Sequence, residues 1–268
     1  MTEADAIDKV DDPVTISTLV SDFQDLGVNA GDTLLVHSSL SSLGWVAGDA
    51  PAVVDALQEV LTEDGTLVMP THSFQYSDPE WWESPPVPDH WVEIIREERP
   101  PFRPEVTPTR GMGAIPECFR NYPGVLRSNH PTSSFAAWGA GAEEVTSNHS
   151  PSYGLGDESP LARVYDRGGK VLLLGVGYDR NTSLHLAEMR ADIDLEEVNY
   201  AFPLVRDGER VSVEYTDVMT NTEDFEAVGA AFEAEIGATK GEVGAAECTL
   251  IDQPALVDFA VSWFESNR

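Results

Sequence analysis

The sequence predicts an α/β fold in which a mixed sheet with parallel central strands is flanked by helices and carries an inserted Pro/Trp-rich lobe. Three observations support this fold class. Short apolar runs of strand length alternate with segments whose apolar residues recur at helical spacing. Residues 31–70 form one strand, helix and strand unit, which is expected to be right-handed and parallel. Residues 73–108 lack a regular pattern and hold Trp81, Trp82 and Trp91, as is typical of a lid or an inserted lobe.

The first elements follow from local patterns. A helix is expected at residues 15–26, because apolar residues lie three or four apart and Gly27 ends the pattern. The run 31–37 is an apolar strand after a Gly-Asp turn, and 64–70 repeats that layout. Asp49 begins the helix between these two strands.

The rest of the chain continues the alternation, and the whole predicts one domain of residues 1–268 with an insertion at about 73–108. The turn Asp207-Gly208 between two strand-like runs predicts a hairpin instead of another crossover unit. The later elements are expected as a helix at 110–122, strands at 133–138 and 171–174, hairpin strands at 198–204 and 210–215, a helix at 222–236, a strand at 248–251 and a helix at 253–264.

Polar residues follow three of the expected strands. The strand at 31–37 leads into a loop of four serines, and the strand at 64–70 leads into Thr71-His72-Ser73. After the strand at 171–174, a glycine turn opens into a helix that carries His185 and Glu188. Residues three apart share a helix face, so this imidazole and carboxylate are expected to converge. Parallel strands place their ligand crevice at their carboxyl ends, which predicts a site at this edge.

Seven blocks of the sequence carry a resemblance to a known family. They begin with VHSSLSSLGWV and GTLVMPTHS and end with NTSLHLAE. In order they lie at residues 36–46, 65–73, 81–91, 107–120, 127–139, 159–177 and 181–188. The chain resembles the aminoglycoside 3-N-acetyltransferases, also called antibiotic N-acetyltransferases, from about Thr15 to Val261. One departure is Arg103, between Phe102 and Pro104, where many relatives carry Asp; it bears on the acceptor specificity.

The resemblance implies direct transfer of an acetyl group from acetyl-CoA to an amine of an aminoglycoside or related aminated small molecule, and hence an antibiotic-resistance activity. The amine must lose a proton, so a base with a pKa near 7 is needed. His185 is our candidate base, with His130 as its competitor. Glu188 is expected to orient the ring or hold the cationic substrate. The thioester oxygen gains negative charge, for which backbone amides near Ser38 or the Thr71 hydroxyl are candidate donors.

Two segments are expected to bind coenzyme A, because small residues and free backbone N–H groups can receive phosphate oxygens. The first is the serine loop and the second is the start of the helix at 110–122. Candidate substrate-binding residues besides Glu188 are Asp192, Tyr76 and Asp78. The coenzyme A candidates are Ser38, Ser39, Leu40, Ser42, Leu43, Gly44, Arg110, Gly111, Met112 and Gly113.

Two alternative functions belong to other classes. A metal-dependent hydrolase is possible in principle, because three of His37, His72, His130 and His185 would suffice for an open zinc site. Against it, the sequence lacks an HExxH-type spacing, and the family uses no metal, so we expect none. The other alternative is a catalytically silent protein that only binds coenzyme A or an amine; the presence of both His185 and Glu188 argues against it.

The net charge of −31 excludes nucleic acid as a natural partner, because a phosphate backbone requires a basic surface. Such a field can attract cationic aminoglycosides. However, the acids are spread along the whole chain and only Lys9, Lys170 and Lys240 are lysines, which favours adaptation to molar salt in a halophilic, archaeal source. No apolar run approaches the roughly 18 residues that span a bilayer. The N-terminus is acidic, so we expect a cytoplasmic enzyme without a membrane partner.

Overall fold

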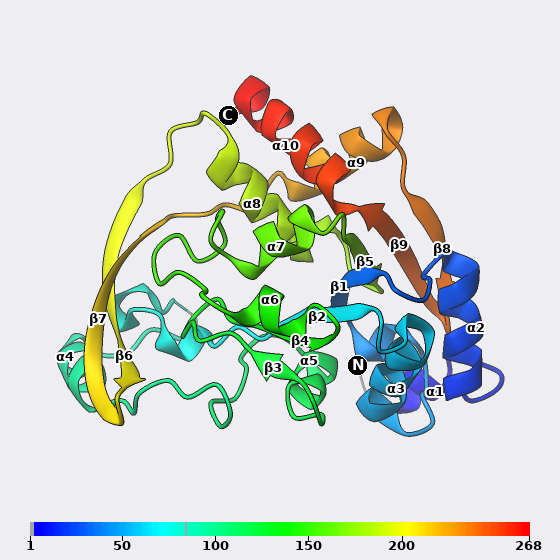
Figure 1. The fold of residues 1–268 in the computed structure, drawn as a ribbon, viewed down its shortest axis with the longest axis horizontal. Helices are drawn as coiled ribbons and strands as arrows, with labels where there is room; N and C mark the ends of the chain where they lie inside the picture. The colour runs from blue at the N-terminus through cyan, green and yellow to red at the C-terminus, as the bar shows by residue number, and fades with distance from the viewer. Residues whose placement is uncertain (1–2, 84) are drawn as a thin grey trace.

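A seven-stranded mixed sheet forms the centre of the molecule in the computed structural model, which describes residues 3–83 and 85–268 (Figure 1). The strand order is β3-β4-β2-β1-β5-β9-β8. The strands are β1 (Thr33–Ser38), β2 (Thr66–Pro70), β3 (Leu126–Arg127), β4 (Phe135–Gly139), β5 (Lys170–Leu174), β8 (Thr239–Val243) and β9 (Ala246–Asp252). β6 (Glu197–Arg206) and β7 (Glu209–Val218) form a separate two-stranded sheet.

Helices cover both faces of the large sheet. The longer ones are α2 (Ile16–Leu26), α3 (Asp49–Leu61), α4 (Asp89–Glu98), α8 (Ser183–Arg190), α9 (Phe225–Glu235) and α10 (Gln253–Asn267). The shorter ones are α1 (Glu3–Ile7), α5 (Ala114–Phe119), α6 (Ala142–Thr146) and α7 (Pro160–Asp166), with 3-10 turns at Leu40–Ser42, Phe74–Tyr76, Pro79–Trp81 and Tyr178–Arg180. In the described part of the chain, no helix combines the length and the apolar character needed to cross a membrane.

The central strands are buried on both faces, so successive residues enter different cores. In β1, Leu34 and Val36 pack with α2, α3 and α5, while Leu35 packs on the opposite side with α6 to α10. β2 and β5 alternate in the same way. The continuous apolar runs of the sequence therefore correspond to strands that are covered by a helix layer on each face.

β1 lies between β2 and β5 and is parallel to both. The flanking strands β4 and β9 run the other way, because β4 pairs antiparallel with β2 and β9 with β5, and the outermost strands β3 and β8 pair antiparallel with β4 and β9 in turn. The predicted sheet, with parallel strands at its centre and antiparallel strands at its edge, is therefore confirmed. The carboxyl ends of β1, β2 and β5 share one edge, where the chain order changes direction and open α/β sheets place their ligands.

The inserted segment packs against the β6–β7 hairpin. The N–H of Phe102 donates to the carbonyl of Pro203 at 2.9 Å, and a small aromatic cluster joins the two parts. Arg127 fixes both ends of the insertion to the sheet, because its guanidinium donates to Ser73 Oγ at 2.7 Å and to the Thr107 carbonyl at 2.5 Å. Burial lowers the pKa of Arg127 to about 10. Figure 1 shows the hairpin beside α4.

Several sequence expectations change in detail. The predicted helix at 110–122 is only six residues long, from Ala114 to Phe119, because Gly111 and Gly113 adopt positive φ and Pro116 follows closely. The insertion contains the helix α4, which was not predicted. The hairpin exists as predicted but forms its own sheet. The short elements β3, β8, α6 and α7 were also not predicted.

Candidate active site

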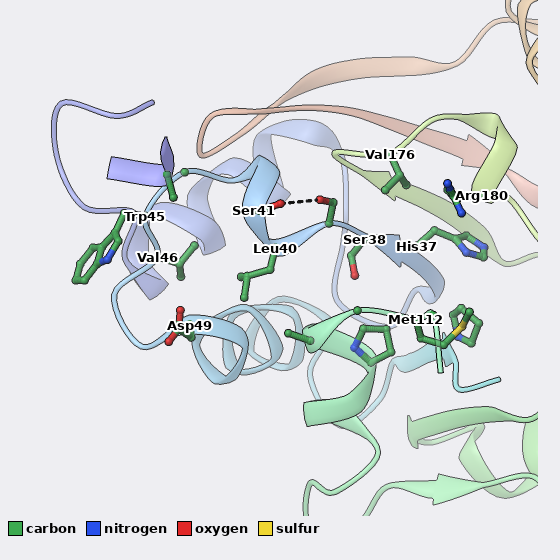
Figure 2. A pocket seen from close by; sticks show the side chains of 18 of the residues that line it. His37, Ser38, Leu40, Ser41, Trp45, Val46, Asp49, Met112, Val176 and Arg180 are labelled. Carbon is green, nitrogen blue, oxygen red and sulfur yellow. Dashed lines mark hydrogen bonds between the residues drawn. The ribbon is translucent and has the colours of Figure 1, made fainter. Parts of the chain in front are cut away.

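A cavity of about 720 Å³ opens at the carboxyl edge of the parallel strands. Of the predicted coenzyme A residues, Ser38, Ser39, Leu40 and Gly44 line one wall (Figure 2). Gly111, Met112 and Gly113 also line it. The two predicted segments thus meet, although they are far apart in the sequence.

Three of the predicted coenzyme A residues lie elsewhere. Leu43 is fully buried in the core, because the 3-10 turn Leu40–Ser42 directs it inward. The Ser42 hydroxyl donates to the Gly175 carbonyl at 3.0 Å, its oxygen lies 2.9 Å from Ser39 Oγ, and Ser42 lines a different hollow. Arg110 is exposed outside the cavity, and its N–H donates to the His72 carbonyl at 2.9 Å. These three side chains therefore do not line the cavity, in contrast to the other predicted residues of the two segments.

The cavity also contains residues that the sequence analysis missed. Val176, Arg180 and Thr182 come from the segment between β5 and α8, where Val176 and Thr182 fall in two successive resembling blocks and Arg180 lies between those blocks. Trp45 and Val46 follow the serine loop directly. The sequence signal for these cavity residues is their position beside predicted ones. Which side chains point into the cavity, however, depends on the backbone conformation of each turn. Figure 2 shows His37 and Arg180 at the same end of the cavity.

His185 and Glu188 form a hydrogen-bonded pair on α8, as predicted. The His185 Nδ1 atom lies 2.5 Å from Glu188 Oε2. The His185 side chain is 12% exposed, whereas Glu188 is 0% exposed. A carboxylate can only accept a hydrogen bond, so Nδ1 carries a hydrogen, and in the neutral ring Nε2 then has the lone pair. The His185 N–H donates to the carbonyl of Thr182, which places the pair next to the cavity lining.

Two neutral histidines accompany this pair. Burial, reinforced by the charge of His185, lowers the pKa of His37 to about 3 and that of His72 to about 3. His37 Nε2 lies 3.4 Å from the Thr182 hydroxyl, and the buried His72 Nε2 has no hydrogen-bond partner among the described residues. Both rings are therefore uncharged at neutral pH.

His130 is held in a structural role, contrary to its prediction as a possible base. Its Nδ1 accepts the N–H of Ser133 at 2.9 Å, so its Nε2 carries the proton and donates to the carbonyl of Pro151 at 3.2 Å. The ring is fully buried and stacks on His149 at 4.5 Å. Burial lowers its pKa to about 4. No free lone pair remains on His130, and no local pattern indicates these backbone partners.

The predicted oxyanion donor Thr71 is likewise occupied. Thr71 is fully buried and its hydroxyl lies 3.4 Å from Ser134 Oγ, within the contacts that join β2 to β4. Ser38 Oγ, in contrast, is a buried hydroxyl without a partner in the described residues. Figure 2 shows it pointing into the space between the end of β1 and the segment that carries Met112. Ser38 is therefore the better-placed donor.

Three residues predicted to bind substrate serve other contacts. The Tyr76 hydroxyl donates to the Pro100 carbonyl at 3.0 Å inside the insertion. Asp78 accepts from Arg96 at 2.7 Å and also caps a 3-10 turn. α8 ends at Arg190, so Asp192 lies beyond the helix, is exposed and does not extend the face of Glu188. Neither the Tyr76 hydroxyl nor the Asp78 carboxylate is free for a ligand.

Both oxygens of Glu188, the fourth such residue, are also engaged within the protein. One of its oxygens is bonded to His185, and the other accepts from Arg268 and from the N–H of Asn221. A different acid approaches His185 from the hairpin. Burial raises the pKa of Asp217 on β7, and the charge of His185 opposes that rise. In the described residues Asp217 makes no ion pair, and its carboxylate accepts the N–H of Val218 at 2.9 Å.

The four histidines proposed for the hydrolase alternative do not form a metal site. Among the residues that the structure describes, no group of three His, Cys, Asp or Glu side chains is arranged to hold a metal ion. Both nitrogens of His130 are bound to the backbone, and Nδ1 of His185 is bound to Glu188. His130 therefore has no ring nitrogen left for a metal, and His185 keeps only Nε2.

The sequence profile of a family described as aminoglycoside 3-N-acetyltransferase matches residues 35–265. The chain belongs to this family. An aminoglycoside N(3′)-acetyltransferase-like protein, YokD, of a Bacillus subtilis prophage is 47% identical over 256 residues, which are 95% of this chain and 94% of YokD. The crystal structure of YokD matches with a TM-score of 0.96, 45% identity and 98% coverage of both chains.

Two solved acetyltransferases carry ligands. AAC-IIIb in a binary complex with CoASH matches with a TM-score of 0.86 and 30% identity, over 95% of this chain and 97% of that chain. AAC-VIa bound to sisomicin matches with a TM-score of 0.86 and 33% identity, over 96% and 99% of the two chains. The predicted family and enzyme class, an N-acetyltransferase with acetyl-CoA as co-substrate, are confirmed and are favoured over the hydrolase and the silent binding protein.

Proposed function

We propose that the protein transfers the acetyl group of acetyl-CoA to an amine of an aminoglycoside or related aminated small molecule, with His185 as the general base. The observation that carries this assignment is the His185–Glu188 pair next to the cavity end formed by His37 and Thr182. Of the histidines predicted for the site, His185 has a hydrogen-bonded carboxylate and an Nε2 left to accept a proton.

The residues support a direct transfer. Nε2 of His185 takes a proton from the acceptor amine as its nitrogen attacks the thioester carbonyl carbon. In this step the Ser38 hydroxyl, which lacks a partner among the described residues, and the first N–H groups of the turn Leu40–Ser42 donate to the oxyanion. Collapse of the intermediate breaks the carbon–sulfur bond and releases coenzyme A thiolate, which regains the proton. The acetyl group remains on the amine.

The coenzyme lies, in this proposal, along the cavity between the serine loop and Gly111 to Gly113. The acceptor approaches from the hairpin side, where the half-buried Asp217 faces His185. A carboxylate that lacks an ion-pair partner within the described residues suits an ammonium group of the acceptor. The binding of sisomicin by AAC-VIa supports an aminoglycoside as the acceptor class.

A thiol-release assay tests the proposal. Purified protein with acetyl-CoA is given sisomicin and other amines in molar potassium chloride, and the acetylated amine is identified by mass spectrometry. We expect amine-dependent thiol release with one acetyl group added to the acceptor. Thiol release without an acetylated amine, or no release with any amine, contradicts the proposal.

A cytoplasmic location remains our expectation, since that compartment supplies acetyl-CoA. We also retain the expectation of a single domain with an insertion.

A further inference from the structure

Arg268 reaches the buried carboxylate of the catalytic pair from the far end of α10. Its guanidinium contacts the oxygen of Glu188 that His185 does not use. The same guanidinium donates to the two oxygens of Asp224 at 2.8 and 2.6 Å and to the carbonyl of Asn221 at 3.1 Å. It also lies 4.1 Å from the centre of the Phe264 ring. The Arg268 side chain is 18% exposed, so these contacts are largely shielded from water.

A fully buried carboxylate needs a positive partner, because an isolated charge in the interior is strongly unfavourable. Glu188 has two candidates for that partner, protonated His185 and Arg268. An arginine is always charged in proteins. While Arg268 balances Glu188, His185 does not have to be protonated to neutralise the pair. Without Arg268, the pair gains stability by binding one more proton.

The other ionisable groups that face His185 do not replace Arg268. His37 and His72 come from the ends of β1 and β2, and both oppose a positive charge on His185. Asp217, from β7, favours that charge. The second carboxylate of the network, Asp224, contacts Arg268 and holds its guanidinium in place. Arg268 is thus the permanent cation that contacts the carboxylate side of the pair.

We propose that Arg268 is a positioning residue for the acetyl transfer: it neutralises Glu188 so that His185 stays uncharged, with Nδ1–H toward Glu188 and Nε2 free for the acceptor proton. This inference rests on the proposed role of His185 as the base. The same inference explains why α10 contacts α8 and the segment from Asn221 to Asp224. These contacts hold the Arg268 guanidinium against Glu188.

The test is the pH dependence of kcat/KM for Arg268→Gln and Arg268→Lys. Removing the positive charge leaves Glu188 to stabilise protonated His185, so the proton is held to higher pH and the acid limb moves upward. We expect a shift of about one pH unit or more for Arg268→Gln. Arg268→Lys keeps the charge, and its acid limb should lie closer to that of the wild type. KM for acetyl-CoA should be nearly unchanged.

Arg190→Gln is a matched control. Arg190 is on α8, the helix that carries His185 and Glu188; its side chain is 24% exposed, it pairs with Asp157 at 2.7 Å and it lies 4.3 Å from the Tyr165 ring centre. Its loss removes a comparable ion pair but no contact to Glu188, so the acid limb should not move. An equal fall in kcat at every pH for Arg268→Gln, without a shift of the limb, overturns the inference, as does a shift of the same size in Arg190→Gln.

Failure of the proposed function gives a different result. If His185→Gln retains the wild-type rate and acid limb, the base assignment fails and the inference fails with it. If His185→Gln removes turnover but Arg268→Gln keeps the wild-type limb, only the inference fails. Should Arg268→Gln not fold, Arg268→Lys compared with Asp224→Asn decides. The lysine keeps the positive charge and should leave the limb in place, whereas loss of the Asp224 charge leaves Arg268 to neutralise Glu188 alone and should move the limb downward. The absence of that difference overturns the inference.

Discussion

The His185 Nδ1 atom lies 2.5 Å from Glu188 Oε2, and this contact fixes which nitrogen of the ring can accept a proton. His130 has the opposite arrangement, since both of its ring nitrogens are bound to the backbone. Replacing His185 with Gln should therefore lower kcat by roughly 100-fold or more, the usual contribution of a general base, with little change in KM for acetyl-CoA. Steady-state kinetics at pH 7.5 measures this.

His130→Gln is the comparison for that experiment. It should act through stability, because it disturbs buried contacts with Ser133 and Pro151 and not the reacting groups. A folded His130→Gln protein without turnover, beside a His185→Gln protein of nearly normal activity, would reverse the two roles.

Filling the cavity provides a second prediction. Met112 lines the wall opposite the serine loop, so Met112→Trp should occupy space that the pantetheine arm needs. We expect KM for acetyl-CoA to rise by roughly tenfold, about 1.4 kcal/mol, while the melting temperature changes little. Leu126→Trp is the control, because Leu126 is 44% exposed on β3 and does not line the cavity. Similar KM values in both variants would show that the coenzyme binds elsewhere.

The oxyanion donor can be tested separately. Ser38→Ala removes a buried hydroxyl that has no partner within the described residues, so the fold should lose little stability. Loss of one oxyanion donor typically costs about 100-fold in kcat. Thr71→Val, in contrast, should act mainly on stability, since that hydroxyl faces Ser134. An unchanged kcat in Ser38→Ala would assign the oxyanion to backbone N–H groups alone.

The sequence predicted the parts of the site that depend on local patterns. The strands β1, β2 and β5 follow from apolar runs, and the contact between His185 and Glu188 follows from a spacing of three on one helix. The meeting of the serine loop with the Gly111 segment rested on the resemblance, because no local pattern connects the two. Local patterns do not predict which way a single side chain in a turn points, as the Ser42 side chain shows.

Contacts between distant segments account for what was missed. Arg268 contacts Glu188 across 80 residues of sequence, and the insertion joins the hairpin through Phe102 and Pro203. Such pairs depend on the assembled fold and not on the propensity of either segment. The antiparallel direction of β4 and β9 likewise follows from how the chain returns to the sheet, since an apolar run does not encode its direction.

The buried histidines predict a loss of stability at mildly acidic pH. The pKa values of His37, His72 and His130 are lowered to about 3, 3 and 4, below the usual 6.5. The unfolded chain therefore binds more protons as the pH falls below 6.5, and the folded state is disfavoured by up to about 1.4 kcal/mol per pH unit for each ring. The melting temperature should fall between pH 7.5 and 5.5 at constant potassium chloride.

His72→Phe tests the cause of this pH dependence. The ring packs edge-on to Phe74 and Phe135, and its Nε2 has no partner in the described part of the chain, so Phe should fit with little loss of packing. The variant should show a shallower fall of the melting temperature, while His90→Gln, at an exposed position, should follow the wild type. A wild-type melting temperature that stays level across this range would contradict the prediction.

The acidic composition predicts dependence on salt. A chain of net charge −31 repels itself over a Debye length of about 10 Å at tenth-molar salt, and this length falls to about 3 Å at molar salt. Melting temperature and activity should therefore both decline as potassium chloride is lowered from molar to tenth-molar.

Two controls test whether charge is the cause. The double variant Asp11→Asn with Asp12→Asn, at two adjacent exposed acids, should weaken the salt dependence slightly. Sucrose at equal osmolality, which screens no charge, should not replace the salt. If the melting temperature is the same at both salt concentrations, adaptation to salt is wrong, and the charge is better explained as a field that attracts a cationic acceptor. In that case the KM for the amine, and not the stability, should increase steeply with salt.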